Sequence, residues 1–303
     1  MNTSLWIHLF LFPGLLFAVP ASWFYVWGEH KATARIQRRI GPPLLQPVYD
    51  LVKLFGKRTP ARHGIEANLL RLWPALSVLS MVGAIAMLPV FPGGPGFAGD
   101  AVILVALLEI PSICFILAGF TSGSVFAQIG AIREAILSVA CNVVFLLSIV
   151  TIAVTGRTFH LSDLANVTSN PGHWIGVFGI LLCIPAKLRL NPFSTSSAEQ
   201  EIYSGALTEY AGAALAMWKL AHGLEWVALT GFVATMVVPA GGAWWVHAIL
   251  FVAISFAEVL LLSAVAAATG RLTLERSIRF YWRWAAILAV LSVSASVYAR
   301  FRS

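Results

Sequence analysis

Three carboxylates stand inside long apolar stretches of this sequence, at Glu109, Glu225 and Glu258. A charged side chain at the centre of a membrane helix costs roughly 2.5–3.5 kcal/mol on insertion scales, so each should face a cavity or a partner. Lys219 and His222 are candidate partners for Glu225. Because burial disfavours the charged form of a carboxyl group, these residues could exchange protons near neutral pH. A static ion pair or interhelical hydrogen bond explains each of them equally well.

Two polar blocks also break the apolar pattern, and we predict that they form one working surface. The first, residues 29–57, carries several cations and a rigid Gly-Pro-Pro turn at 41–43. Its apolar residues at 44, 48, 51 and 55 recur at helical spacing, which predicts a short amphipathic helix in a membrane interface. A basic loop that binds lipid headgroups would explain the cations, but not Gln46 and Asp50 among them. The second block covers residues 191–210.

The composition requires a bilayer around the elements that hold these blocks. Hydrophobic residues make up 59% of the 303 residues and charged residues only 11%, with a mean hydropathy of +0.83. Such a chain satisfies its backbone hydrogen bonds in a membrane by forming helices of about 20 residues. We therefore predict an all-α polytopic membrane protein with one membrane domain over 1–303. The apolar stretches predict eight spans, at 5–27, 70–91, 99–119, 134–155, 173–190, 212–238, 244–268 and 281–299. Residues 5–27 are expected to be a retained first helix.

The distribution of lysine and arginine predicts the orientation of these spans. Sixteen of the 20 basic residues fall in alternate loops or at their edges, and only Arg157, Arg300 and Arg302 fall on the other side. The positive-inside rule then places the basic loops in the cytoplasm and both termini outside. The net charge of +7 is therefore mainly a topology signal, and nucleic acid is not an expected partner.

Several kinds of chemistry have no support in the sequence. The three cysteines, at 114, 141 and 183, lie at wide spacing inside apolar stretches, which fits neither a disulfide framework nor a metal site. There is no nucleophile–base set and no glycine-rich phosphate loop. We expect the chain to be catalytically inert by itself and to hold no cofactor.

The polar blocks resemble a known family. The segment RIQRRIGPPLLQPVYDLVKL resembles the R-x-Q-x-R-x-G-P and L-Q-P-x-x-D-x-x-K-L signature of the complex I subunit 1 family, a membrane component of NADH-quinone oxidoreductase. The segment NPFSTSSAEQEIYSGALTEYAG is similar to a second motif, P-F-D-x-x-E-A-E-Q-E followed by T-E-Y-S-G, and GAIRE at 130–134 resembles G-A-x-R-E. The spacing is most similar to the membrane-anchor subunits of group 4 NiFe hydrogenases and formate hydrogenlyase-type complexes.

This resemblance implies a membrane-anchor subunit in a prokaryotic inner (cytoplasmic) membrane. The cytoplasmic loops, about 29–69 and 187–211, would dock a peripheral arm whose subunits carry iron–sulfur clusters and a NiFe or quinone site. Antiporter-like membrane subunits would be further partners. The matched positions imply a docking and cavity rim of Glu29, Arg35, Gln37, Arg39, Gly41, Pro42, Gln46, Asp50, Lys53 and Arg133. With the buried carboxylates, they imply a proton path through Glu109, Glu134, Glu199, Glu201, Glu209, Tyr210, Lys219, Glu225 and Glu258.

Three departures from the family pattern bear on that path. Ser194, Ser197 and Asn142 stand where the family has carboxylates. Serine and asparagine do not store a proton at accessible pH, so proton transfer would be weakened or rerouted. Three other functions remain open: the quinone-binding subunit of a NADH-quinone oxidoreductase, a stand-alone ion transporter, and a lipid-facing scaffold with no coupling role. A transporter of that class often shows two repeated halves, and no such repeat is visible here.

Overall fold

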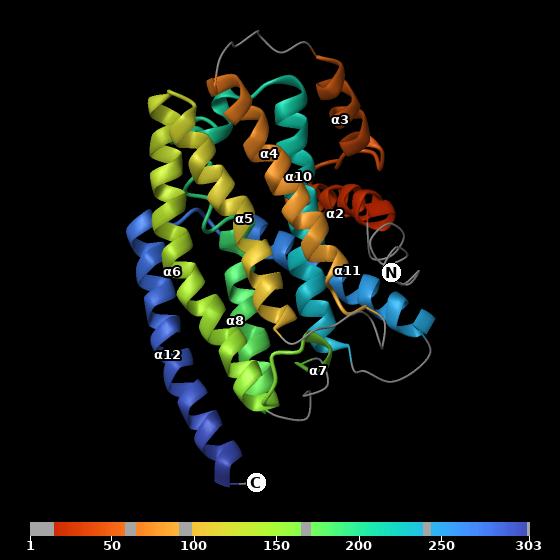
Figure 1. Cartoon of the computed structure of the whole chain (residues 1–303). Helices are drawn as coiled ribbons and strands as arrows, with labels where there is room; N and C mark the ends of the chain where they lie inside the picture. The colour runs from red at the N-terminus through yellow and green to blue at the C-terminus, as the bar shows by residue number, and fades with distance from the viewer. Residues whose placement is uncertain (1–14, 58–64, 91–98, 165–170, 239–243, 302–303) are drawn as a thin grey trace.

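The computed structural model describes residues 15–57, 65–90, 99–164, 171–238 and 244–301, and every regular element in these ranges is helical (Figure 1). Its long helices are α2 (Leu15–Ile36), α4 (Ile65–Ala86), α5 (Asp100–Thr121), α6 (Val125–Gly156), α8 (Pro171–Lys187), α10 (Gly212–Val237), α11 (Trp244–Ala268) and α12 (Leu274–Phe301). Short elements lie between them: α3 (Gln46–Gly56), α7 (Leu161–Leu164), α9 (Glu199–Ile202) and the 3₁₀-helix η1 (Gly205–Glu209).

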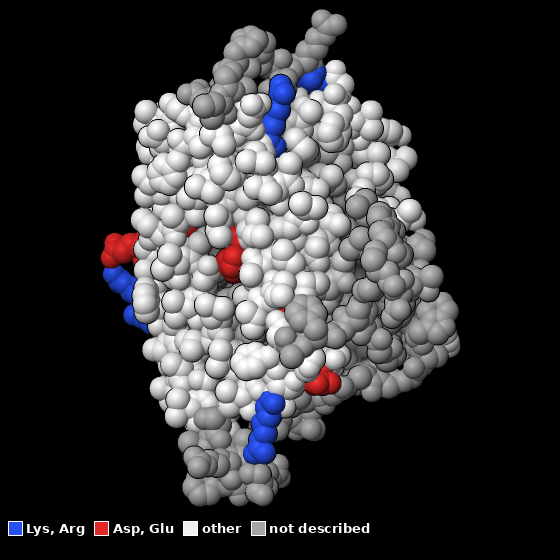
Figure 2. All heavy atoms as spheres, in the orientation of Figure 1, with Lys and Arg blue, Asp and Glu red and all other residues white. Residues whose placement is uncertain are grey.

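Helix α10 is the centre of the bundle. Within its apolar stretch 83% of the residues are buried, compared with 33% for α11, which lies at the periphery. It packs against α4, α2, α11 and α3, and α6 packs between α5, α8 and α12. On the face shown in Figure 2 charged side chains are few and uncharged atoms form most of the surface. This is the surface that a bilayer requires, because hydrocarbon cannot solvate charges.

The prediction of a multi-pass helical protein is confirmed. Five helices of the described ranges are long and apolar enough to cross a membrane, namely those over 68–86, 100–121, 125–156, 212–237 and 245–268. The predicted spans 5–27, 173–190 and 281–299 correspond to α2, α8 and α12, and the first 14 residues lie outside the described ranges. Helix α8 has 17 described residues, and α12 carries charged residues in its first turns.

Several predicted boundaries were wrong, and tertiary contacts explain why. Helix α6 begins at Val125 rather than at residue 134, because its first turns pack against η1 and α9. Helix α2 continues to Ile36 rather than ending at residue 27, and α12 begins at Leu274 rather than 281. Apolar periodicity marks the membrane-embedded part of a helix, whereas backbone hydrogen bonds continue into the polar turns beyond it.

Helix α3 forms where the amphipathic helix was predicted, with Pro47 in its first turn, a position that accepts proline. Its packing differs from the predicted pattern. Pro47 and Leu51 are buried against the bundle, whereas the apolar residues at 44 and 55 are 52% exposed. Tyr49 and Val52 are exposed as well. The helix therefore has one apolar edge on the protein and a second apolar edge facing outward.

The second polar block is held against α6 by a close approach of two glycines. A Cβ atom added to Gly130 would lie 2.9 Å from both the Gly205 Cα and the Ser196 carbonyl oxygen. Gly205 itself has φ of +56°, in the left-handed region that favours glycine. Only a residue without a side chain at 130 allows the loop to lie directly on the helix.

Substituting Gly130→Ala should destabilise the protein by about 1–3 kcal/mol, because the new methyl group meets backbone atoms that cannot move aside. Gly83→Ala is the matched control, since its Cβ would meet only the Leu107 methyl groups at 3.6 and 3.9 Å. That helical substitution should be neutral or stabilising by up to about 1 kcal/mol. Thermal unfolding of both variants in detergent measures the difference, and equal midpoints would show that the loop does not depend on this contact.

Candidate functional site

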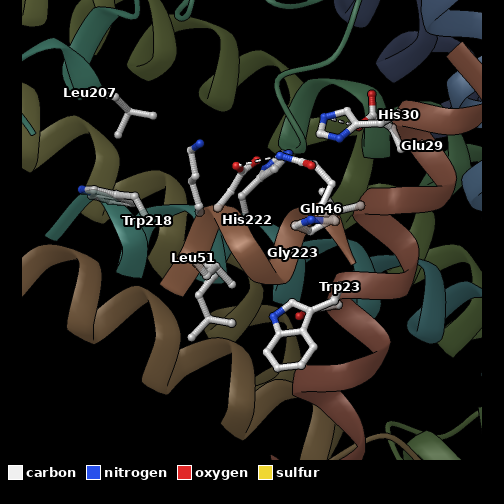
Figure 3. A pocket seen from close by; sticks show the side chains of 15 residues that line it. Trp23, Glu29, His30, Gln46, Leu51, Leu207, Trp218, His222 and Gly223 are labelled. Carbon is white, nitrogen blue, oxygen red and sulfur yellow. Dashed lines mark hydrogen bonds and ion pairs between the residues drawn. The ribbon is translucent and has the colours of Figure 1, made fainter. Parts of the chain in front are cut away.

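The two polar blocks meet at one cavity of about 280 Å³ between α2, α3, α10 and η1. Figure 3 shows side chains of these elements converging on the cavity from several directions. Its polar lining residues are Ser22, Glu29, His30, Gln46, Asp50, Lys219 and His222. Its walls are largely apolar, with Trp23, Val26, Pro47, Leu51, Leu207, Trp218 and Leu220. The first block supplies Glu29, His30, Gln46 and Asp50 to this lining, and the second block supplies one residue, Leu207.

The Gly-Pro turn of the first block is fastened to the end of α2. Lys31 donates a hydrogen bond to the Gly41 carbonyl (3.3 Å), and the Trp27 indole donates one to the Pro42 carbonyl (3.2 Å). A Cβ on Gly41 would lie 2.7 Å from the Lys31 Cδ, so glycine permits this approach. Arg38 takes a left-handed conformation (φ +58°) that ends α2 and redirects the chain. These contacts fix where α3 begins.

The predicted rim residues divide into two groups. Glu29, Gln46 and Asp50 line the cavity, and the Gln46 amide donates a 3.0 Å hydrogen bond to the Asp50 carboxylate. Those that do not line it and are exposed are Arg35, Gln37, Arg39 and Lys53. Exposed cations are available to contact another molecule, whereas the Gln46–Asp50 pair is positioned to bind within the cavity.

Arg133, also predicted for the rim, instead anchors the second block. Its guanidinium donates to the Glu201 carboxylate (2.5 Å) and to the Thr195 carbonyl (3.4 Å). The hydrogen bond from Arg133 lowers the pKa of Glu201, and its positive charge adds to the effect. Glu201 is half-exposed, so it is poorly suited to a buried path. The side chain of Glu199 lies outside the described residues.

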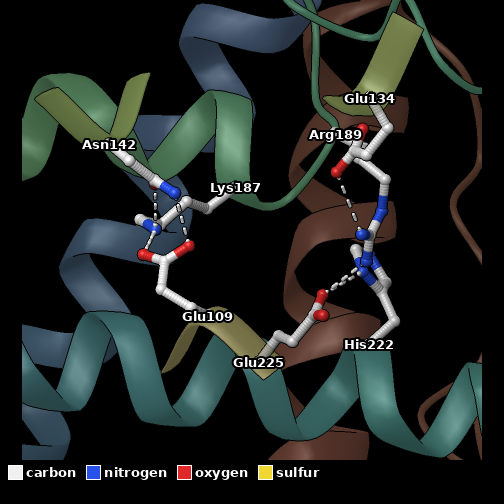
Figure 4. A network of polar contacts seen from close by, with 7 residues as sticks. All are labelled: Glu109, Glu134, Asn142, Lys187, Arg189, His222 and Glu225. Carbon is white, nitrogen blue, oxygen red and sulfur yellow. Dashed lines mark hydrogen bonds and ion pairs between the residues drawn. The ribbon is translucent and has the colours of Figure 1, made fainter. Parts of the chain in front are cut away.

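Two clusters of buried charged side chains lie within the bundle (Figure 4). In the first, Lys187 at the end of α8 donates to Glu109 of α5 and to the Asn142 amide oxygen of α6 (3.0 Å). Asn142 completes the triangle by donating to Glu109 at 2.8 Å. The charges of the Lys187 ammonium and the Glu109 carboxylate cancel, and the Asn142 amide supplies both a donor and an acceptor. Asn142, which carries no charge, thus takes part in a charge-balanced group.

The second cluster is organised by Arg189. Its guanidinium lies 2.7 Å from Glu225 of α10 and 3.5 Å from Glu134 of α6, both of which are buried. His222 Nδ1 lies 3.4 Å from the same Glu225 oxygen. Arg189 lies just beyond the end of α8 with φ of +56°, and the hydrogen bond from Leu190 N to the Pro185 carbonyl closes this turn. The left-handed turn directs the arginine into the bundle.

Glu258 lies apart from these clusters. It is buried on α11, where that helix packs against α2, one turn from Ser255. Ser255 shares a 2.5 Å hydrogen bond with Tyr25 of α2. Glu209 belongs to η1, and Tyr210 directly after it is buried with its ring 5.8 Å from that of Trp218.

Comparison with known proteins agrees with the family resemblance of the two polar blocks and extends it to nearly the whole chain. A profile of the NADH dehydrogenase family matches residues 8–297. The chain belongs to this family. It is 32% identical over 217 residues to hydrogenase-4 component C of Escherichia coli K12, with 69% of each chain covered. It is 31% identical over 224 residues to formate hydrogenlyase subunit 4 of the same strain, covering 69% of this chain and 71% of the relative.

Two more distant matches extend over more of the chain. A subunit of the NADH-quinone oxidoreductase of Dehalococcoides mccartyi (strain ATCC BAA-2266 / KCTC 15142 / 195) is 23% identical over 297 residues, which cover 93% of this chain and 84% of the relative. The fold matches a chain of the membrane-bound sulfane sulfur reductase, an archaeal respiratory membrane complex. That match has a TM-score of 0.86 and 24% identity, and it covers 97% of this chain and 99% of the other.

In this NADH dehydrogenase family member, sequence reasoning missed the cations of both clusters. Lys187 and Arg189 were interpreted as topology signals, yet both are paired with buried carboxylates. The proposed pairing of Glu225 with Lys219 was wrong, because Lys219 is exposed at the cavity, while His222 is a partner as predicted. The sequence did contain a signal for them. Buried carboxylates need cations as partners, and Lys187 and Arg189 stand at the end of an apolar stretch. Among the described residues no group of three or more His, Cys, Asp or Glu side chains could hold a metal ion.

Removing the Arg189 cation should be the most costly single change in this site. Arg189→Gln leaves Glu134 and Glu225 buried without it, a loss of about 3–5 kcal/mol for a broken buried pair. The unfolding midpoint in detergent should fall by roughly 10 °C. Arg133→Gln, which breaks the exposed pair with Glu201, should cost less than about 1 kcal/mol. Adding Glu225→Gln to Arg189→Gln should recover part of the lost stability. Equal destabilisation by Arg189→Gln and Arg133→Gln would contradict the assignment of Arg189 as the cation that neutralises the buried carboxylates.

Proposed function

We propose that this chain is the membrane-anchor and coupling subunit of a complex I-like redox assembly of the energy-converting hydrogenase or formate hydrogenlyase type. One observation carries the proposal: residues of the first polar block and Leu207 of the second, far apart in sequence, line a single cavity with residues of α10. Membership of the NADH dehydrogenase family and the likeness to hydrogenase-4 component C and formate hydrogenlyase subunit 4 support it.

The proposed placement is in a prokaryotic cytoplasmic membrane with eight spans, α2, α4, α5, α6, α8, α10, α11 and α12. The polar loops at about 29–69 and 187–211 face the cytoplasm and both termini lie outside. The exposed cations of the rim, Arg35, Arg39 and Lys53, then face a peripheral arm. Iron–sulfur clusters and the NiFe or quinone site belong to the subunits of that arm, and antiporter-like subunits continue the membrane part.

The coupling role rests on the second buried cluster. It contains two carboxylates, Glu134 and Glu225, but a single permanent cation, Arg189. Such a group is stable in a low-dielectric interior when it holds one further proton, on a carboxyl or on His222. His222 both contacts Glu225 and lines the cavity, so it joins the working surface to the cluster. The Glu109–Lys187 pair is already neutral, which makes the Arg189 cluster the proton store in our proposal.

Reversing the charge of the rim should separate the peripheral arm from the membrane part. Arg35→Glu with Arg39→Glu places carboxylates where the arm is expected to contact cations, so iron–sulfur subunits should be lost while membrane partners remain. Mass spectrometry of the gently solubilised assembly, purified through a tag on this chain, identifies the partners. Arg71→Glu, which changes an exposed arginine on α4, is the control. Retention of the arm by the double variant, or the absence of redox partners from the wild type, would contradict the proposal; the latter would favour a transporter.

Neutralising the proton store should uncouple proton release from electron transfer. Glu225→Gln leaves Arg189 balanced by Glu134, so the assembly should form and transfer electrons, but the group can no longer take an additional proton. Proton release by proteoliposomes, divided by the electrons transferred, should fall. Glu201→Gln removes a half-exposed carboxylate of the second block and should leave the ratio unchanged. Unaltered coupling in Glu225→Gln would remove this cluster from the path.

A quinone-binding role is the second candidate, and the cavity itself favours it. Its tryptophan and leucine walls suit a flat apolar ring, and Gln46 and His222 could donate hydrogen bonds to the quinone oxygens. A photoreactive quinone analogue should then label residues near Gln46 or Leu207, with Trp23→Ala reducing the labelling. Absence of labelling, together with hydrogen evolution by the purified complex, would support the hydrogenase-type function instead.

A further inference from the structure

A second cavity, distant in sequence from the polar blocks, lies along the first turns of α12 and has a volume of about 550 Å³. It combines guanidinium groups with large apolar side chains. Its lining residues are Leu272, Arg276, Arg279, Phe280, Arg283, Trp284 and Ile287. The proposed function uses none of them.

The three arginines lie on one face of α12. Positions 276, 279 and 283 are separated by three and four residues, which brings their side chains together on successive turns. Arg279 forms an ion pair with Glu275, at 2.6 Å, and both of these side chains are well exposed. Three guanidinium groups beside this one carboxylate give the groove an excess of positive charge. Guanidinium groups bind the oxygens of phosphate through paired N–H donors.

The floor of the groove is aromatic and is held by the rest of the protein. The Phe280 ring lies 5.5 Å from Phe193 of the second block, and the Trp284 ring lies 5.8 Å from Phe178 of α8. Beyond the arginines the exposed surface of α12 is apolar, with Ile287, Val290 and Val293 between 47% and 69% exposed. Figure 1 shows α12 along the outer edge of the bundle.

We propose that this groove binds the headgroup of an anionic phospholipid. The phosphodiester oxygens accept hydrogen bonds from Arg276, Arg279 and Arg283, while the acyl chains lie along Trp284 and the apolar residues beyond it. The order of charges and apolar surface along α12 matches the order of headgroup and hydrocarbon in a bilayer leaflet. A soluble partner would match the arginines but would have no counterpart for the exposed Ile287 and Val290. The proposal does not depend on the redox function.

The experiment uses the intact assembly, purified through a tag on this chain and placed in nanodiscs of phosphatidylcholine with increasing phosphatidylglycerol. Native mass spectrometry after release into detergent counts the phosphatidylglycerol retained. Each arginine near an anionic surface contributes about fivefold in binding, so Arg276→Gln, Arg279→Gln and Arg283→Gln together should weaken retention on the order of a hundredfold. Glu275→Gln, which releases Arg279, should retain phosphatidylglycerol at least as well as wild type.

Two further variants keep the outcome decisive. Arg71→Gln removes an exposed arginine from α4 and should leave retention unchanged. If the variant with all three arginines changed to glutamine does not assemble, Arg276→Lys, Arg279→Lys and Arg283→Lys together keep the positive charge. This variant should assemble and still prefer phosphatidylglycerol. Arg283→Gln alone should weaken retention about fivefold. Equal retention of phosphatidylcholine and phosphatidylglycerol by the wild type would overturn the proposal. So would a photocrosslinker that replaces Trp282, an exposed residue next to Arg283, and captures a protein subunit in place of lipid.

Discussion

The interior of this helical bundle depends on the neutralisation of charge in a medium that does not solvate it. Arg189 lies between Glu134 of α6 and Glu225 of α10, and Lys187 lies against Glu109 of α5. In water such pairs would contribute little, but a buried carboxylate left without its cation is strongly unfavourable. The segment at the end of α8 therefore joins three helices, α5, α6 and α10. The position of α10, at the centre of the bundle, is consistent with the same contacts.

The second polar block is positioned by contacts of a different kind. Gly130 lets backbone lie directly on α6, and Arg133, about one turn further on, holds the Glu201 carboxylate. From the other side, Leu272 N donates to the Pro192 carbonyl and Arg271 donates to Ser194. The block thus rests on α6 and on the loop before α12, and it places η1 beside α10. Through this placement the block contributes Leu207 to the lining of the cavity.

How far the site could be predicted is clearest for individual residues. The helix over 46–56 and the pairing of His222 with Glu225 followed from spacing along the chain, since neighbours at three or four residues share a helix face. The partners of Glu109 are 33 and 78 residues away, and no periodicity relates them. Arg133 was assigned to the rim from its motif, but its guanidinium is directed to the second block, because that block packs over it. The sequence identified the apolar residues of α3, but it did not show which of them pack on the bundle and which face outward.

The sequence was sufficient to establish that this protein lies in a lipid bilayer, that it is helical, which family it belongs to and which two segments carry polar chemistry. Composition and the length of the apolar stretches decide the first two, because continuous apolar stretches of about 20 residues cross hydrocarbon as helices. Three-dimensional packing was needed to learn which cation meets which carboxylate, and that Lys187 and Arg189 lie within the bundle. Charge pairing inside a membrane depends on distances of a few ångström between helices, and these are set by how the helices pack rather than by order along the chain.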